Sequence, residues 1–237
     1  MMRKYLNGTE QKEIEEIIEA SNEYDRTDYS VPSDADLWLL SCHYGKIVSF
    51  LAVYFMGDTH EGHPVDEVLL FTHPLERGKK RAGRLFEKYC AYVTSEYKEI
   101  PHARFTVYPS EKTESFLEHM DAVHEGDELL MTRMLSGSAD LPEEDLCFSN
   151  EHSECSVRTY GDTAYIYGVR TDASYLRRGS AERLLTKVIS ELSEKGAGKA
   201  LLQVSSLNTP AVRLYEKLLF TVEERMELWY DNKLSNF

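Results

Sequence analysis

Apolar residues recur near the start of the chain at two different periods. Three isoleucines within 14–18 stand at helical spacing after Thr9, a residue type that caps helices. Apolar runs at 37–42 and 47–55 then flank a turn that contains Gly45, which is the pattern of a β-hairpin. The chain is therefore expected to open with an amphipathic helix and a hairpin.

The segments that follow alternate between strand and helix patterns. Strand-like runs lie at 65–72, 103–108 and 128–135, and helix-like runs lie around 85–92 and at 111–120. The basic stretch Arg77–Arg81 joins the first of these strands to the first helix. Strands that alternate with helices indicate an α/β layer arrangement, which we expect to hold a mixed sheet with flanking helices.

Small, proline and acidic residues at 136–145 interrupt this pattern, and the same order then returns. The second series comprises strands at 155–159 and 164–171, a loop at 176–181, a helix that ends near 195, a strand at 200–204, a helix from 208 and a strand at 225–230. With Val107 set against Val204, the last helices of the two series, around Leu117 and Tyr215, run in step. We interpret the chain as a tandem repeat of one fold.

The repeat predicts a division of the chain into two domains. Residues 1–136 form the first domain, 137–145 a linker and 146–237 the second domain. The second copy is shortened, because the sequence leaves no room between the linker and its first strands for a counterpart of the helix at 10–22.

Composition excludes several classes of protein. The 237 residues are 42% hydrophobic and 29% charged, which excludes disordered and fibrous chains. A formal charge of -14 repels nucleic acid and either maintains solubility or attracts cationic substrates such as amines. No apolar run reaches the roughly 18 to 20 residues of a membrane span, and the first eight residues lack an apolar signal core. We expect a cytoplasmic protein with neither a membrane nor a nucleic-acid partner.

The four cysteines, at 42, 90, 147 and 155, are too few and too scattered for a disulfide framework. We expect reduced thiols. Cys147, His152 and Cys155 lie close in sequence, but a structural zinc site needs four ligands in paired short spacings. No metal is therefore expected.

The loop that starts the helix after residue 179 has the composition of an anion site. Gly179 allows close approach of the backbone, Ser180 and Ala181 are small, and Arg177 and Arg178 supply positive charge. The amides at a helix N-terminus favour pyrophosphate. An ordinary tight turn with solvated arginines would have the same composition. The composition of the loop therefore fits both a pyrophosphate site and an ordinary turn.

Two motifs in order give the loop its context. The stretch Tyr175–Leu185 and the later Asn208 with Leu214-Tyr215-Glu216-Lys217 and Phe220 resemble the GNAT family of acetyl-CoA-dependent N-acyltransferases. The resemblance is strong over 163–230 and weak in the first half. It implies that the loop binds the pyrophosphate of acetyl-CoA, a co-substrate, and that Asn208 lies beside the thioester.

The same resemblance assigns two catalytic roles. It implies that Tyr215 donates a proton to the leaving thiolate, although its helix face also suits a packed core aromatic. It implies a backbone amide near Gly168, Val169 or Arg170 that polarises the thioester carbonyl. The strand 163–171 contains no acid to act as base; the nearest candidates are Tyr165, Tyr167 and Asp172, and water is the remaining alternative.

Departures from the family pattern limit these expectations. Leu176 stands where the family has Arg or Gln, and Leu219 replaces the usual Gly before Phe220. In the first half Lys80 stands where the loop glycine should be, so we expect that copy to be degenerate and catalytically silent. The leading hypothesis is transfer of acetyl to a primary amine of a small molecule or peptide, with cationic amines favoured. The rival is a regulatory module that holds acyl-CoA without turnover; the sequence leaves the acceptor and the oligomeric state open.

Overall fold

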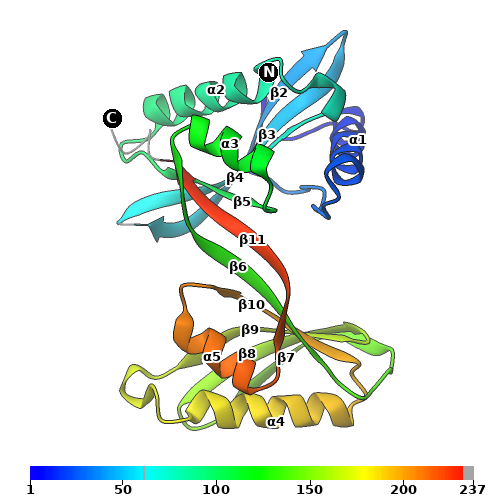
Figure 1. Cartoon of the computed structure of the whole chain (residues 1–237), viewed down its shortest axis with the longest axis vertical. Coiled ribbons are helices and arrows are strands. Elements are labelled where there is room, and N and C mark those ends of the chain that lie inside the picture. Colours follow the sequence, from blue (N-terminus) through cyan, green and yellow to red (C-terminus); the bar gives the residue numbers. More distant parts are fainter. Residues whose placement is uncertain (61, 232–237) are drawn as a thin grey trace. The chain divides into compact units, whose positions relative to one another are not determined.

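The computed structural model describes residues 1–60 and 62–231, which form two compact units (Figure 1). Of the described residues, unit 1 comprises 1–125 and 227–231, and unit 2 comprises 126–226. Within the described ranges no helix has both the length and the hydropathy needed to cross a membrane.

Unit 1 is a sheet with helices on both faces. Its elements are β1 (Met2–Arg3), α1 (Gly8–Asp25), β2 (Leu37–His43), β3 (Lys46–His60), β4 (His63–Thr72), a 3₁₀ turn (Pro74–Glu76), α2 (Arg81–Glu96), β5 (His102–Val107), α3 (Glu111–His119) and the start of β6 (Ala122–Met134). Strands β1 to β4 pair antiparallel in chain order, and β4 pairs parallel with β5.

Unit 2 has a smaller sheet and fewer helices. Its elements are β7 (Leu141–Ser149), β8 (Ser153–Gly161), β9 (Thr163–Thr171), a 3₁₀ turn (Ala173–Tyr175), α4 (Ser180–Glu194), β10 (Lys199–Ser205), α5 (Thr209–Lys217) and the start of β11 (Thr221–Asp231). Strands β7 to β9 are antiparallel and β9 pairs parallel with β10. The expected mixed sheet with flanking helices is confirmed.

Strands β6 and β11 each contribute to both units. The later part of β6 lies in unit 2 and pairs antiparallel with all of β10, from Glu128 opposite Ser205 onward. The later part of β11 lies in unit 1 and pairs with β5, where Trp229 stands opposite Phe105. The boundaries between units therefore fall within strands, whereas the sequence placed domain boundaries at 136 and 146.

Two local expectations need correction. Helix α1 is capped by Asn7 rather than Thr9: the Asn7 side chain accepts from the Thr9 and Glu10 amides, and the Glu10 carboxylate accepts from the Asn7 amide. Residues 141–145 were expected in a linker but begin β7. Strand β7 lies at the edge of its sheet, a place where a proline and exposed acidic side chains are compatible with a strand.

The cores follow the alternation of side chains along the strands. In unit 1, Trp38 and Leu40 face α1, whereas Leu37 and Leu39 face α2. In unit 2, helices α4 and α5 pack against one face of the sheet. Helix α4 contributes five buried aliphatic side chains to this core, namely Leu184, Leu185, Val188, Ile189 and Leu192. The amphipathic pattern read from the sequence is thus the buried face of α4.

Candidate functional site

Strands β9 and β10 of unit 2 separate before either strand ends. Their parallel pairing stops at Ile166 opposite Leu202, although β9 continues to Thr171 and β10 to Ser205. Beyond that point backbone groups of both strands lack a ladder partner on this side, and such groups require another partner. The opening in the sheet is therefore a place where an extended ligand can bind.

A β-bulge lies on β9 beside this opening. Tyr167 is opposite Ser156 and Arg170 is opposite Glu154, so that Gly168 and Val169 together face one residue of β8. Gly168 has φ +62°, which suits glycine, and is exposed. A bulge takes backbone groups out of the ladder. The bulge at Gly168 and Val169 lies within the three positions, 168 to 170, where the sequence predicts the backbone amide that polarises the carbonyl; that role stays a prediction.

The loop from β9 to α4 presents a helix N-terminus without a side-chain cap. Gly179 is the N-cap residue with φ +75°, and Arg177 also has a left-handed conformation with φ +60°. Ala181 lies in the first turn of the helix. The first amides of a helix lack intrahelical acceptors and attract anions. Leu176 is 56% exposed, so its side chain contributes no charge to this loop.

The arginines of the loop remain available to a ligand. Among the residues that the structure describes, neither Arg177 nor Arg178 forms an ion pair, and both are exposed. The Arg178 guanidinium lies 5.3 Å from the centre of the Tyr175 ring. The loop therefore carries two uncompensated positive charges in a protein of formal charge -14.

The turn between β7 and β8 holds the start of α4 in place. The Asn150 side chain donates to the Ser180 carbonyl oxygen at 3.0 Å and accepts from the Ser180 hydroxyl at 3.0 Å. The Ser153 hydroxyl donates to the buried Ser180 hydroxyl at 2.8 Å. Because the Ser180 side chain is engaged in this way, a contribution of Ser180 to coenzyme binding must come from its backbone amide.

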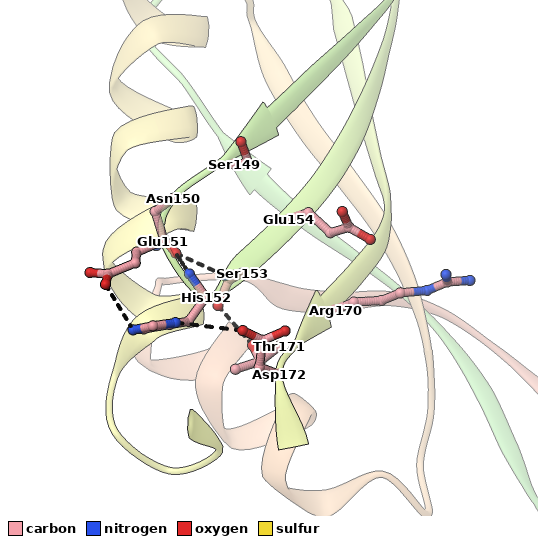
Figure 2. A pocket seen from close by; sticks show the side chains of 9 residues that line it. All are labelled: Ser149, Asn150, Glu151, His152, Ser153, Glu154, Arg170, Thr171 and Asp172. Atoms are coloured by element: carbon pink, nitrogen blue, oxygen red, sulfur yellow. Dashed lines mark hydrogen bonds and ion pairs between the residues drawn. The ribbon is translucent and has the colours of Figure 1, made fainter. Parts of the chain in front are cut away.

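A cavity of about 360 Å³ lies beside this turn (Figure 2). The ring nitrogens of His152 lie 3.5 Å from the Asp172 carboxylate and 3.7 Å from the Glu151 carboxylate, and the ring stacks on Tyr175 with centroids 3.3 Å apart. Figure 2 shows the Arg170 side chain extending away from His152. The cavity is thus lined in part by the end of the bulged strand and by Asp172, where the loop begins. His152 contacts both Asp172 and Tyr175 of that loop.

Helix α5 carries the two residues of the second motif. The Asn208 side chain caps the helix by accepting from the Ala211 amide at 3.3 Å. Tyr215 is buried, 6% exposed, and packs against Phe220 with centroids 6.1 Å apart. Burial raises the pKa of Tyr215, with the Cys155 thiol adding to the effect, and the phenol remains protonated at neutral pH.

The three nearest candidates for a base are engaged elsewhere. The Tyr165 hydroxyl donates to the Gln203 side chain at 2.8 Å, and the Tyr167 hydroxyl donates to Asp145 at 3.1 Å. Burial raises the pKa of Tyr165, which makes its anion scarce at neutral pH. Asp172 pairs with His152. These contacts favour water as the route for the amine proton.

The corresponding loop of unit 1 has the same backbone conformation, but its arginines are paired with carboxylates. Gly78 has φ +75° and Lys80, the N-cap of α2, has φ +58°, as Arg177 and Gly179 do in unit 2. The Glu76 carboxylate forms ion pairs with Lys79 at 2.9 Å, Arg81 at 2.6 Å and His43 at 3.2 Å. Hydrogen bonding from Lys79 first, and then from Arg81, lowers the pKa of Glu76 to about 2.

Two further features separate the unit 1 loop from its counterpart. Arg77 forms an ion pair with Asp25 of α1 at 2.6 Å, so its charge is compensated. Strand β4 pairs with β3 without interruption from Asp66 to Thr72. Since β4 has no bulge in this stretch, it offers no amide equivalent to that beside Gly168.

Sequence reasoning missed the residues that brace the site. Asn150 lies in a short turn between β7 and β8 that no sequence motif marks. The bulge depends on pairing between β8 and β9, and the glycine at 168 is the one sign of it in the sequence. The structure holds none of the four cysteines in a disulfide, with Cys155 buried in the core and Cys147 exposed. In the part of the chain that the structure describes, no cluster of His, Cys, Asp or Glu could hold a metal ion.

The fold is that of GCN5-related N-acetyltransferases. The chain superposes on the enzyme of this class from Sphaerobacter thermophilus with a TM-score of 0.69 at 14% identity, covering 97% of this chain and 94% of that one. It also superposes on a tandem GNAT protein from the clavulanic acid biosynthesis pathway, with a TM-score of 0.59 at 11% identity, covering 97% and 98%. At these identities the likeness defines the fold alone.

The match to a family model lies within unit 2. Residues 146–220 match the model of the Acetyltransferase (GNAT) family. A mycothiol acetyltransferase from Corynebacterium aurimucosum is 40% identical over 65 residues, 27% of this chain and 21% of that protein. The [ribosomal protein bS18]-alanine N-acetyltransferase of Escherichia coli is 36% identical over 59 residues, 25% of this chain and 40% of that protein. The chain thus spans less than half the length of these relatives.

Proposed function

We propose that the protein is an acetyl-CoA-dependent N-acetyltransferase in which unit 2 binds the coenzyme and carries the reaction. The observation that carries this proposal is the contrast between the two loops. They share a backbone conformation, but only the unit 2 loop, with Gly179 at the helix start, has unpaired arginines beside a bulged strand. The match of residues 146–220 to the GNAT family model supports the same unit.

In the proposed reaction the amine nitrogen attacks the thioester carbonyl carbon, and the carbon–sulfur bond then breaks. The amide near Gly168 or Val169 stabilises the negative charge that develops on the carbonyl oxygen. The departing thiolate takes the proton of Tyr215, which is regained from solvent, and the amine proton passes to water. Arg177, Arg178 and the amides of Gly179, Ser180 and Ala181 hold the pyrophosphate, and Asn208 keeps α5 in place beside the thioester.

The acceptor in this proposal is a primary amine of a small molecule or peptide. Of the relatives, one is named for mycothiol, a small molecule, and another for an alanine of a ribosomal protein. The charge of -14 favours cationic amines over anionic ones. We further propose that the protein works in the cytoplasm.

Turnover tests the proposal directly. Acetyl-CoA is mixed with polyamines, aminoglycosides, amino acids and peptides, and release of free coenzyme A is measured. Acetylation of at least one amine is expected, and Gly179→Asp should abolish it. The rival function, an acyl-CoA-binding module favoured by the exposed Leu176, predicts a calorimetric signal with coenzyme A but no release with any acceptor.

Tyr215→Phe tests the proposed acid. General acid catalysis contributes roughly 10²- to 10⁴-fold, and phenylalanine preserves the ring that packs on Phe220. The single-turnover rate should fall at least about tenfold with coenzyme affinity and Tm unchanged. An unaltered single-turnover rate would return Tyr215 to a purely structural role.

A further inference from the structure

A second cavity, of about 670 Å³, lies in unit 1 and is not lined by the loop at 76–81. It is formed by the chain between β1 and α1, the segment that leads into β2, the middle of β3 and the end of α2. Its volume falls within the range of roughly 300 to 1,000 Å³ that small-molecule sites occupy.

Aromatic side chains form much of the wall. Trp38, Phe55, Tyr92 and Tyr97 all line the cavity. Tyr97 lies edge to face with Phe55, with centroids 6.1 Å apart, and with Tyr92, with centroids 6.2 Å apart. Phe55 is 41% exposed and Tyr97 is 38% exposed, so both rings have surface that a ligand would cover. The face of such a ring attracts a cation.

Two carboxylates accompany these rings. Asp34 and Asp36 line the cavity and are exposed. The Asp36 carboxylate accepts from the Phe55 amide at 2.8 Å, which places it beside an aromatic ring. Lys4 also lines the cavity, so that the two carboxylates outnumber the one ammonium group.

Burial is the main cause of the raised pKa values of two neighbouring phenols, and the carboxylates of the cavity add to it. Burial raises the pKa of Tyr97 to about 12, with a nearby Tyr92 and then Asp66 and Asp36 adding to the effect. Burial also raises the pKa of Tyr54, followed by the charges of Asp34 and Asp36. A carboxylate that disfavours a phenolate anion favours a cation at the same place.

We propose that this cavity of unit 1 binds a small organic cation, namely an ammonium group that carries alkyl substituents. Aromatic faces and carboxylates together suit a charge on an apolar frame. A calcium or magnesium ion would require six or more oxygen ligands, and an anion would meet the carboxylates. This site is separate from the proposed coenzyme site and does not depend on the proposed acyl transfer.

Choline and its neutral isostere 3,3-dimethylbutan-1-ol have the same shape but differ in charge. Comparing them shows whether the cavity binds the positive charge or only the apolar groups of the ligand. The full chain has only two tryptophans, so the indole N–H signal of Trp38 can be followed by NMR, with Trp229 as internal reference. Choline at up to roughly 10 mM, the millimolar range of weak ligands, should shift the Trp38 signal in a saturable manner. The isostere should bind at least about tenfold more weakly, because it lacks the charge.

Matched variants locate the site. Asp34→Asn combined with Asp36→Asn should weaken choline binding at least about tenfold, and Tyr97→Leu at least about threefold. Asp28→Asn, on the same segment but outside the cavity, and Tyr160→Leu, in unit 2, should leave it unchanged. The shape-preserving Asp variants and the NMR spectrum itself report whether the fold is intact. Equal binding of the isostere, binding unaffected by the Asp pair, or no saturable shift of Trp38 would each overturn the proposal.

Discussion

Single residues decide which of two similar loops can bind an anion. Lys80 adopts the left-handed conformation that Gly179 has in unit 2, so the backbone tolerates a side chain at this position. The difference between the loops is therefore one of space and charge at the helix start rather than of folding. Glu76, whose counterpart in the second loop is Tyr175, provides an internal anion in unit 1.

Gly179→Asp should abolish coenzyme binding without unfolding unit 2. The added carboxylate would meet the pyrophosphate, and the expected loss is at least about 100-fold in affinity, or about 3 kcal/mol. A β-carbon at this position would lie 3.3 Å from the flexible Arg183 guanidinium, so Tm should fall by only a few degrees. Isothermal calorimetry with coenzyme A measures the effect.

Gly78→Asp is the matched control for that change. Its φ of +75° equals that of Gly179, and a β-carbon there would meet nothing within 4 Å. Coenzyme affinity should stay at the wild-type value. If Gly78 were instead the sensitive position, the assignment of the active unit would be reversed.

Asp66 should make stability depend on pH. Burial raises the pKa of this carboxyl to about 6 from 3.8, although a hydrogen bond from Tyr89 acts in the opposite direction. Because the unfolded chain loses the proton first, stability falls as pH rises from 3.8 to 6 and is level above. About two pKa units correspond to about 3 kcal/mol at most.

Asp66→Asn removes that dependence because the amide does not titrate. Relative to wild type, the variant should gain stability as pH rises through this window, which urea unfolding at pH 4.5 to 8 measures. Tyr89→Phe, which deletes the hydrogen bond donor, should extend the loss of stability to higher pH. Parallel stability curves for wild type and Asp66→Asn would contradict the account.

At the scale of elements, the turn between β7 and β8 acts as a brace for α4. Asn150→Ala would delete the bonds to Ser180 and those that the side chain accepts from the His152 and Ser153 amides. Since an unmet hydrogen bond costs about 1 to 3 kcal/mol, Tm should fall and coenzyme affinity should drop about fivefold or more. Asn7→Ala, which removes the cap of α1, should lower Tm and spare coenzyme affinity.

Elements were more predictable than their connections. The segments 37–42 and 164–171 lie within observed strands, and the buried leucines of α4 were visible from their spacing, because local periodicity reports the face that a segment buries. Strand β7 was missed, since Pro142 and acidic residues conceal an edge strand. The bulge at Gly168 and the role of Asn150 depend on pairing with other segments, which periodicity does not encode.

At the scale of the molecule, the two units are not consecutive pieces of chain. Unit 2 includes the later part of β6, which pairs with β10 over seven residue pairs. A fragment of residues 126–226 should therefore unfold more cooperatively than a fragment of 140–226, which leaves one edge of β10 unpaired. Circular dichroism during heating compares the two. Identical cooperative transitions would show that β6 is dispensable to unit 2.

The exchange of strands also has a consequence for biosynthesis. Phe105 lies opposite Trp229 in the sheet, and Trp229 is far later in the chain, so the sheet of unit 1 lacks a strand until the ribosome has synthesised β11. During that interval the edge of β5 is open to pairing with neighbouring nascent chains. Slowed elongation or premature termination should consequently expose the first half of the chain, rather than the last, to aggregation and to chaperones.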